Sequence, residues 1–469
     1  MITTDVDWIA EAVGGTLAGS AEAGLVTGAV RTDSREVSTG DLFVARRGES
    51  GDGHDYVVTA QRQGAAAAIV EHPVPDATLA QIVVADATRA LGLLAEAVLL
   101  QARSDGRLEH VIGITGSAGK TTTKRILAHL LSQAGETVFP QGSFNNEVGA
   151  PLTMLQTTLQ TRFVVVEMGA SHIGDLRYLS GIAHPDLGIE LQVGLAHVGE
   201  FGSVDNIRIA KQELVESLPE TGVAVLNADD ANVCRMAEHT SAQVVWFGAR
   251  SDAAVRIGAV EPEGERLRVE LTFDGETVDP SVALLGEHNA WNIAAATAAA
   301  LHMGLSREQI VTGLESLSSG ERWRMQALHR ADGVTVINDG YNASPGSMSA
   351  ALRTLAGIRR TGHRTIAVLG AMGELGEASG TEHDKIGQDV VRLNIDQLVV
   401  VGNDARRIFL AAEQEGSWGG EAVYCENADE AHDWLAPRLR EGDVVLVKSS
   451  NAAGLRFLGD RLYEDAARA

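Results

Sequence analysis

Residues 113–122 (GITGSAGKTT) have the residue types and spacing of a phosphate-binding loop. Glycines let the backbone wrap around phosphates, whose charge is met by N–H groups and by the N-terminus of the following helix. Lys120 would reach the β- and γ-phosphates, and the Thr121 hydroxyl would hold Mg²⁺. The common motif has glycine where this chain has Ile114, and a glycine-rich turn with a chance Lys-Thr pair is the alternative. The apolar strand before the loop and the helical spacing after it favour nucleoside triphosphate binding.

Three further side chains could do chemistry beside such a loop, although the loop alone does not separate an ATPase, a kinase and a ligase. Glu167 ends an apolar strand, and the carboxyl ends of parallel strands are where open α/β sheets bind ligands, so Glu167 could hold Mg²⁺. His197 follows another apolar segment and could add a metal ligand. Lys211 lies in a helical segment. Taken singly, each has an ordinary alternative, namely a surface glutamate, a partly buried histidine and a solvated lysine.

The elements that must position these residues fall into three zones, so the sequence predicts an α/β protein of three domains. Residues 1–105 predict a small mixed α/β N-terminal domain, and the polar stretch 102–107 reads as a linker. Residues 106–327 predict a central P-loop ATPase domain with a parallel sheet, and alternating apolar residues between 253 and 285 add a small antiparallel section. Residues 328–469 alternate strands with helices, which is typical of a Rossmann-like, doubly wound domain.

Composition excludes several classes of protein. The 469 residues carry a formal charge of −25, which argues against general affinity for nucleic acid or anionic membranes. No apolar run reaches the ~20 residues of a membrane span, and the N-terminus lacks the pattern of a secretory signal. Cys234 and Cys425 are far apart and have no metal-ligand spacing. The composition therefore indicates a cytoplasmic protein with no nucleic-acid partner and no stable membrane insertion. Separately, we expect a monomer that acts on small molecules.

Taken together, the motifs resemble the Mur ligases, ATP-dependent enzymes that build the peptide stem of the cell-wall precursor. The phosphate-binding loop, Glu167, His197 and Lys211 occur in the family's order, and residues 286–292 (GEHNAWN) match its His-Asn-x-x-Asn signature. The resemblance covers nearly the whole chain. It implies that ATP activates a carboxylate as an acyl phosphate for attack by an amine.

Other segments resemble particular members of the family. Residues 145–151 (NNEVGAP), 338–345 (NDGYNASP) and 369–376 (LGAMGELG) are similar to the members that add D-alanyl-D-alanine to UDP-N-acetylmuramoyl-tripeptide. The Asp-Asn-Pro-Arg motif of the member that adds the third stem residue is absent. Residues 33–35 and 40–43 resemble a uridine-nucleotide domain shared by these two members. The sequence leaves the third residue of the tripeptide open.

The resemblance also implies a role for each matching residue. Lys120, Glu167, His197 and Lys211 would be catalytic, and two Mg²⁺ would be held, one by Thr121 and the other by Glu167 and His197. Lys211 would be carbamylated, which requires burial to lower its pKa, and the carbamate anion can help position metal. The residues implied to bind ATP are Gly116, Ser117, Ala118, Gly119, Lys120, Thr121, Thr122, Asn289, Asn292, Arg324 and Asp339. Those implied to bind the other substrates are Ser34, Arg35, Asn145, Asn146, Ser171 and Asn342.

Two departures and two alternatives accompany this interpretation. The family's Lys-Gly-Ser-Arg motif is Lys448-Ser-Ser-Asn451 here, so the role of an arginine at position 451 does not carry over. Of Arg322 and Arg324, we choose Arg324 as the ATP-binding residue because it precedes Met-Gln as in the family.

The ligase that adds the third stem residue is the alternative function within the family. A P-loop ATPase or kinase is the alternative outside it, and ADP release that depends on both acceptor substrates would separate a ligase from either.

Overall fold

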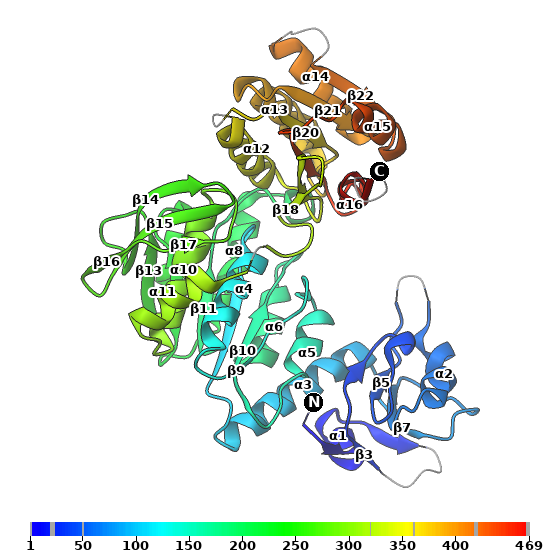
Figure 1. Ribbon diagram of the computed structural model, residues 1–469. Coiled ribbons are helices and arrows are strands. Elements are labelled where there is room, and N and C mark those ends of the chain that lie inside the picture. Colours follow the sequence, from blue (N-terminus) through cyan, green and yellow to red (C-terminus); the bar gives the residue numbers. More distant parts are fainter. Residues whose placement is uncertain are drawn as a thin grey trace.

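The computed structural model describes residues 2–18, 24–48, 51–318, 320–359, 362–416 and 421–465. The predicted α/β fold class is confirmed: three large sheets follow one another along the chain, and each has helices packed on it (Figure 1). The first sheet lies at the lower right of Figure 1, the second at the left, and the third at the top. Among the described residues, no helix is long and apolar enough to cross a lipid bilayer.

The N-terminal part is built on a five-stranded sheet whose strands are parallel except for the first in spatial order. Its order is β2 (Thr16–Ala18), β7 (Ala80–Val83), β6 (Ala67–Val70), β5 (Leu42–Val44) and β4 (Val30–Arg31). A two-stranded sheet of β1 (Thr4–Asp5) and β3 (Leu25–Val26) lies beside it. The helices are α1 (Val6–Ala12), α2 (Val57–Arg62) and α3 (Ala87–Ser104).

Helix α3 connects this part to the centre of the molecule. It begins where the Asp86 carboxylate accepts hydrogen bonds from two backbone N–H groups, and its inner face is buried. The prediction of a linker at 102–107 is wrong for its first three residues, which are helical. Ala102 is buried, and the Arg103 guanidinium donates 2.7 and 3.2 Å hydrogen bonds to Asp186 of the central part. The hydrophobic core is continuous from α3 into the central part.

The central part contains a ten-stranded sheet. The parallel strands run in the order β9 (Glu136–Val138), β10 (Thr161–Glu167), β8 (His110–Thr115), β11 (Leu187–Glu190), β12 (Val223–Asn227) and β13 (Gln243–Gly248). The predicted antiparallel section extends this sheet as β14 (Val255–Glu263), β15 (Arg266–Phe273), β16 (Glu276–Val278) and β17 (Ser281–Val282).

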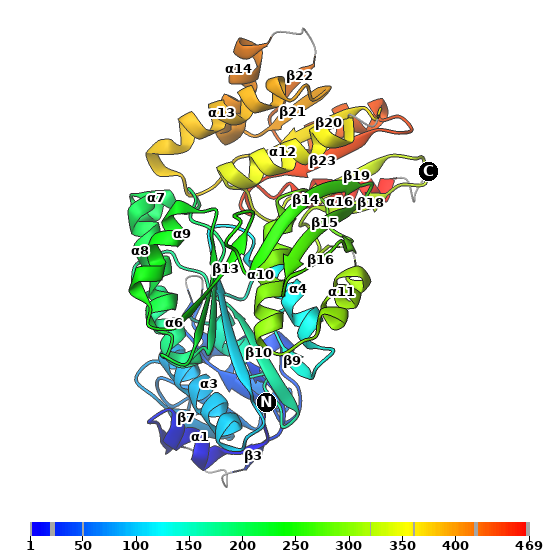
Figure 2. The ribbon, with the colours of Figure 1, turned by 90° about the vertical axis from the view of Figure 1, so that its left-hand side faces the viewer.

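Helices cover both faces of the central sheet, as Figure 2 shows. One face packs against α4 (Lys120–Leu131), α10 (Asn289–His302) and α11 (Arg307–Ser316). The opposite face packs against α5 (Gly149–Met154), α6 (Asp175–Ala183), α8 (Val204–Glu216) and α9 (Ala231–Met236). The strands between the two layers are almost continuously apolar, which is expected of a parallel sheet buried on both sides.

The C-terminal part has a six-stranded sheet, parallel except for its first strand. The order is β18 (Gln326–His329), β19 (Thr335–Asp339), β23 (Val444–Lys448), β20 (Thr365–Leu369), β21 (Gln397–Val401) and β22 (Ala422–Cys425). One face carries α12 (Pro345–Arg359), α13 (Ser379–Arg392) and α14 (Arg406–Glu415), and the other carries α15 (Ala428–Leu435) and α16 (Arg456–Glu464). This is the predicted doubly wound arrangement.

Candidate active site

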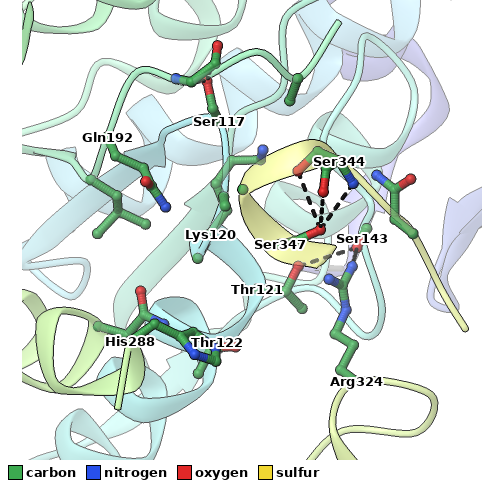
Figure 3. Close-up of a pocket in the computed structure, with 18 of the residues that line it drawn as sticks. Ser117, Lys120, Thr121, Thr122, Ser143, Gln192, His288, Arg324, Ser344 and Ser347 are labelled. Carbon is green, nitrogen blue, oxygen red and sulfur yellow. Dashed lines mark hydrogen bonds between the residues drawn. The ribbon is translucent and has the colours of Figure 1, made fainter. Parts of the chain in front are cut away.

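A cleft of about 1630 Å³ lies at the carboxyl edge of the central sheet, where this sheet faces the C-terminal part. Its walls come from the loop between β8 and α4, the end of β10, the start of α10, the segment before β18, and the start of α12. Figure 3 shows Lys120 and Thr121 opposite Ser344 and Ser347 at the start of α12. Both parts of the chain therefore contribute to one site.

The loop before α4 has the geometry that phosphate binding needs. Gly116 and Gly119 have φ values of 149° and 90°, which favour glycine. A Cβ at Gly119 would lie 2.3 Å from Oδ1 of Asn292, so any side chain there would collide with α10. Lys120 donates a 2.8 Å hydrogen bond to the Gly116 carbonyl, and burial lowers the pKa of this lysine. A cation at a helix N-terminus, beside free backbone N–H groups, suits a phosphate chain.

Thr121 and Arg324 meet at Ser143, although they come from opposite walls (Figure 3). The hydroxyls of Thr121 and Ser143 are 3.2 Å apart, and Arg324 donates a 2.6 Å hydrogen bond to the Ser143 hydroxyl. The Arg324 guanidinium also lies over the Tyr341 ring, 4.2 Å from its centre. Arg322 points elsewhere and pairs with Asp460. Sequence reasoning missed Ser143, which lies in a loop without a recognisable motif.

Glu167 ends β10 with its side chain almost fully buried. Its Oε1 accepts a 2.9 Å hydrogen bond from Asn145, while its Oε2 accepts none from the described residues and lies 3.5 Å from Nζ of Lys124. A buried carboxylate oxygen without a hydrogen bond fits Mg²⁺ coordination. Across the described ranges, no three His, Cys, Asp or Glu side chains are grouped to hold a metal. Other ligands would have to be the Thr121 hydroxyl, phosphate oxygens or water.

His197 links the two sides of the cleft. It precedes the short helix α7 (Val198–Phe201) with a left-handed φ of 62°. Its Nδ1 is in close contact with the Glu374 carboxylate, and the Gly199 N–H donates a 2.9 Å bond to the Glu374 carbonyl. Burial lowers the pKa of His197, and Glu374 acts in the opposite direction. Glu374 lies in the family-like segment 369–376, but its pairing with His197 was not predicted.

Lys211 lies on α8 behind the cleft and is not among the residues that line it. Its side chain is buried, which lowers its pKa to about 7, and the nearby Lys120 adds to the effect. Glu190, at the end of β11, opposes this shift. A lysine with such a pKa is neutral in much of the population near neutral pH, which carbamylation requires.

Asn289 and Asn292 form a buried chain of hydrogen bonds at the start of α10. Asn292 Oδ1 accepts from the Thr123 hydroxyl at 3.2 Å, and its Nδ2 donates to Asn289 Oδ1 at 2.8 Å. Asn289 in turn donates to the Leu285 carbonyl at 2.8 Å. This chain fixes α10 against the phosphate-binding loop, and both asparagines also line the cleft.

On the C-terminal side, Asp339 organises the cleft wall. Its Oδ2 accepts a 2.6 Å hydrogen bond from Lys448, and its Oδ1 accepts from the Met325 N–H at 2.9 Å. Lys448 also donates to the Asn342 carbonyl at 3.0 Å. Asn451, where the family motif has arginine, accepts a 2.5 Å hydrogen bond from Arg456. Arg456, at the start of α16, therefore places an arginine side chain beside position 451.

The structure brings most of the predicted site residues into this cleft. Four lie elsewhere. Gly116 is at the base of the phosphate-binding loop and Lys211 is behind the wall. Ser34 and Arg35 belong to a 3-10 helix (Ser34–Glu36) of the N-terminal part, where Arg35 is exposed and pairs with Asp33 at 2.5 Å. A substrate that contacts Ser34 and Arg35 as well as the cleft would have to extend from the cleft to the N-terminal part.

Comparison with known proteins identifies the class. Residues 28–98 match the description "Mur ligase family, catalytic domain", residues 114–300 "Mur ligase middle domain", and residues 323–451 "Mur ligase, glutamate ligase domain". The UDP-N-acetylmuramoyl-tripeptide–D-alanyl-D-alanine ligase of Mycobacterium tuberculosis is 41% identical over 99% of this chain and 98% of its own. The ligase of the same name from Escherichia coli is 33% identical over 99% of both chains. The chain belongs to the Mur ligase family.

Solved structures agree with this assignment. A crystal structure of MurF from Acinetobacter baumannii superposes with a TM-score of 0.88 at 32% identity, covering 98% of this chain and 99% of its own. MurF ligase from Thermotoga maritima, in complex with ADP, gives a TM-score of 0.81 at 28% identity, covering 95% and 99%. The similarity extends over all three parts of the fold.

Proposed function

We propose that this protein is an ATP-dependent ligase that joins D-alanyl-D-alanine to the terminal carboxylate of UDP-N-acetylmuramoyl-tripeptide. The product would be the UDP-N-acetylmuramoyl-pentapeptide of peptidoglycan precursor synthesis. The observation that carries this proposal is one cleft in which the phosphate-binding Lys120 and Thr121 face Arg324 and Asp339 of the C-terminal part. Full-length similarity to ligases of that name supports the choice of substrates.

In this proposal ATP lies along the loop before α4. The loop N–H groups and Lys120 hold the β- and γ-phosphates, and Arg324 reaches them from the opposite wall. Asn289 and Asn292 contact the nucleoside end, and Asp339 contacts the ribose. The complex of a relative with ADP supports nucleotide binding by this fold. Two Mg²⁺, one held by Thr121 and the other by Glu167 and His197, would neutralise negative charge on the phosphates and the substrate carboxylate.

The chemistry would take place in two steps. The terminal carboxylate of the tripeptide attacks the γ-phosphorus of ATP, so that an acyl phosphate forms and ADP leaves. The free amine of D-alanyl-D-alanine then attacks the acyl carbon, and phosphate leaves. The two anions of the first step repel each other, so Lys120 and Arg324 contribute by concentrating positive charge where the phosphoryl group transfers. We also propose that Lys211 is carbamylated. The protein itself would be monomeric and cytoplasmic.

Binding of the substrates would use both ends of the molecule. Ser34 and Arg35 would contact the uridine nucleotide, and Asn145, Asn146 and Ser171 would contact the peptide at the cleft. Asn342, next to the start of α12, would contact the dipeptide from the C-terminal side. Contact from both sides would also exclude water, which would otherwise hydrolyse the acyl phosphate.

The decisive experiment measures ADP release by the purified protein with ATP and Mg²⁺. UDP-N-acetylmuramoyl-tripeptide and D-alanyl-D-alanine are added separately and together, and the products are analysed by mass spectrometry. We expect turnover only with both substrates and a product whose mass has increased by the dipeptide less water. ADP release that is equal without the dipeptide, or the lack of an amide product, would contradict the proposal.

A further inference from the structure

Glu190 is a fully buried carboxylate to which the proposed mechanism gives no role. It is the last residue of β11, with 0% of its surface exposed. Neither Oε1 nor Oε2 accepts a hydrogen bond from any residue that the structure describes. Leaving such a group without a partner costs free energy, so a buried orphan carboxylate calls for an explanation.

The backbone geometry places Lys211 over the same face of the sheet. Gly188, two residues before Glu190 and on the same side of the strand, packs beneath Leu214: a Cβ at Gly188 would lie 3.1 Å from Leu214 Cγ. Helix α8 leads back from the carboxyl edge of β11 to the start of β12, so it runs antiparallel to the strands. Lys211 is one turn before Leu214. Measured from the contact between Gly188 and Leu214, Lys211 lies about 4.5 Å away along the helix and Glu190 about 6.6 Å away along the strand. Both displacements are towards the carboxyl edge of the sheet.

Thr115, Lys120 and Asp230 also lie near Glu190. Thr115 of β8 is directly opposite Glu190 in the sheet, and its buried hydroxyl also lacks a hydrogen-bond partner among the described residues. Among the described residues, Lys120 and Asp230 also exert charge effects on Glu190. Burial raises the pKa of Glu190 well above its ordinary value, and Asp230 adds to this, while Lys211 and Lys120 oppose it. Glu190 is ionised most readily when a cation stands beside it.

Carbamylation would change the charge of that neighbour, and the following inference rests on the proposed carbamate of Lys211. The Lys211 ammonium loses one proton to become the reactive neutral amine, which forms one N–C bond with CO₂ and gives up a second proton, so a cation becomes an anion. Two adjacent buried anions cannot both stay ionised without a large cost. We infer that Glu190 takes up one of the two protons when CO₂ carbamylates Lys211, and then stands beside the carbamate as a neutral carboxylic acid.

Atoms and charges balance in this step. Before reaction the pair of Lys211 ammonium and Glu190 carboxylate is in equilibrium with the neutral Lys211 amine, which is the form that reacts. Afterwards it is Lys211 carbamate and Glu190 carboxylic acid, with the second proton released to solvent. The acid proton is then available as a hydrogen-bond donor to the carbamate, so Glu190 would act as a positioning residue for the modified lysine. The Thr115 hydroxyl is placed to contribute a second donor.

The test needs neither ATP nor the peptide substrates. The full-length protein is equilibrated with ¹³C-labelled CO₂, the carbamate is detected by ¹³C NMR, and the carboxylic acid by its band in the CO₂-induced infrared difference spectrum. We expect both signals in the unsubstituted protein and neither in Lys211→Ala. In Glu190→Gln the carbamate signal should remain while the acid band is lost, because an amide cannot take up the proton. If this variant does not fold, Glu190→Asp should retain an acid band at a shifted position.

Several outcomes would overturn the inference. A carbamate signal without the acid band would show that both protons reach solvent. An acid band that persists in Glu190→Gln would belong to another residue. No carbamate at saturating CO₂ would remove the step altogether. The ligase assay is independent of these signals, so failure of the proposed activity and failure of this inference can be told apart.

Discussion

The indole Nε1 of Trp323 donates hydrogen bonds of 3.0 Å to both carboxylate oxygens of Asp460 on α16. Asp460 also accepts from Arg322 at 2.8 Å and from Asn338 at 3.0 Å. Trp323 has a left-handed φ of 63°, and Met325, on the other side of Arg324, has a φ of 46°. Each such residue costs roughly 1–3 kcal/mol and persists only when its surroundings fix it. The contact with Asp460 therefore holds the bend that directs Arg324 into the cleft.

The first prediction tests this anchor. Asp460→Ala should raise the KM for ATP about tenfold, which corresponds to about 1.4 kcal/mol, by releasing the bend that positions Arg324. In an Arg324→Ala background the same substitution should have almost no further effect, because the two residues act through one contact. Asp429→Ala, which removes an exposed partner of Arg461 near the same helix, is the matched control and should leave KM unchanged. Additive effects of the first two substitutions would refute the coupling.

The second prediction concerns the phosphate-binding loop. Lys120→Ala should abolish ADP formation while circular dichroism and the melting temperature stay close to those of the unsubstituted protein, because Lys120 makes only one backbone hydrogen bond. Lys385→Ala, an exposed lysine paired with Glu382, provides the control and should remain active. Full activity in folded Lys120→Ala would rule out the assignment of this loop to ATP.

The third prediction follows from the pKa of Lys211. This pKa is lowered to about 7, so the reactive neutral amine increases as pH rises through 7 and is protonated below it. At constant dissolved CO₂, the carbamate signal should therefore fall as the pH is lowered below about 7, not near the ordinary lysine pKa of about 10.4. The ¹³C NMR signal measures it directly. A midpoint near the ordinary value would contradict the burial of this amine.

A companion experiment tests whether Lys211 acts through its carbamate. Lys211→Ala should lose ligase activity and partly regain it when short carboxylates such as acetate or propionate are added, because they can occupy the place of the anion. Lys385→Ala should not respond to these additives. Wild-type activity in Lys211→Ala without rescue would exclude the carbamate role.

The fourth prediction concerns the buried pair of Lys124 and Glu167. Lys124→Met would leave the Glu167 carboxylate without its cation and should destabilise the protein by about 3–5 kcal/mol, seen as a lower midpoint in urea. The double variant with Glu167→Gln should recover much of this loss, because the remaining amide is neutral. The exposed pair of Arg250 and Asp252 is the control, and Arg250→Met should change stability by about 1 kcal/mol or less. Equal losses in Lys124→Met and Arg250→Met would contradict the role of burial.

The sequence pattern predicted those site residues that come directly after an apolar strand in the chain. The phosphate-binding loop and Glu167 were found because apolar strands precede them, and the carboxyl ends of parallel strands share one edge. Roles for Asn289 and Asn292 came from the family resemblance. The three-sheet α/β class followed from alternating strands and helices, which is a strong pattern over many elements.

Other residues could not be found in this way. β11 is four residues long and contains Gly188 and Glu190, so it did not read as a strand, and Glu190 was missed with it. Ser143 and Glu374 acquire their roles only through contact with distant parts of the chain. Their partners are set by the packing of the two sides of the cleft, which no spacing within the sequence encodes.

The contact between His197 and Glu374 joins metal affinity to the arrangement of the domains. The Glu374 carboxylate in close contact with Nδ1 leaves Nε2 of His197 as the ring nitrogen open to a metal, and a neighbouring carboxylate makes a histidine a better electron donor. Here the carboxylate belongs to the C-terminal part, whereas the histidine belongs to the central part. Cation binding through His197 would thus favour this juxtaposition of the parts, and by thermodynamic reciprocity the same juxtaposition would tighten cation binding by an equal factor. The magnesium concentration would then act on the shape of the molecule as well as on its chemistry.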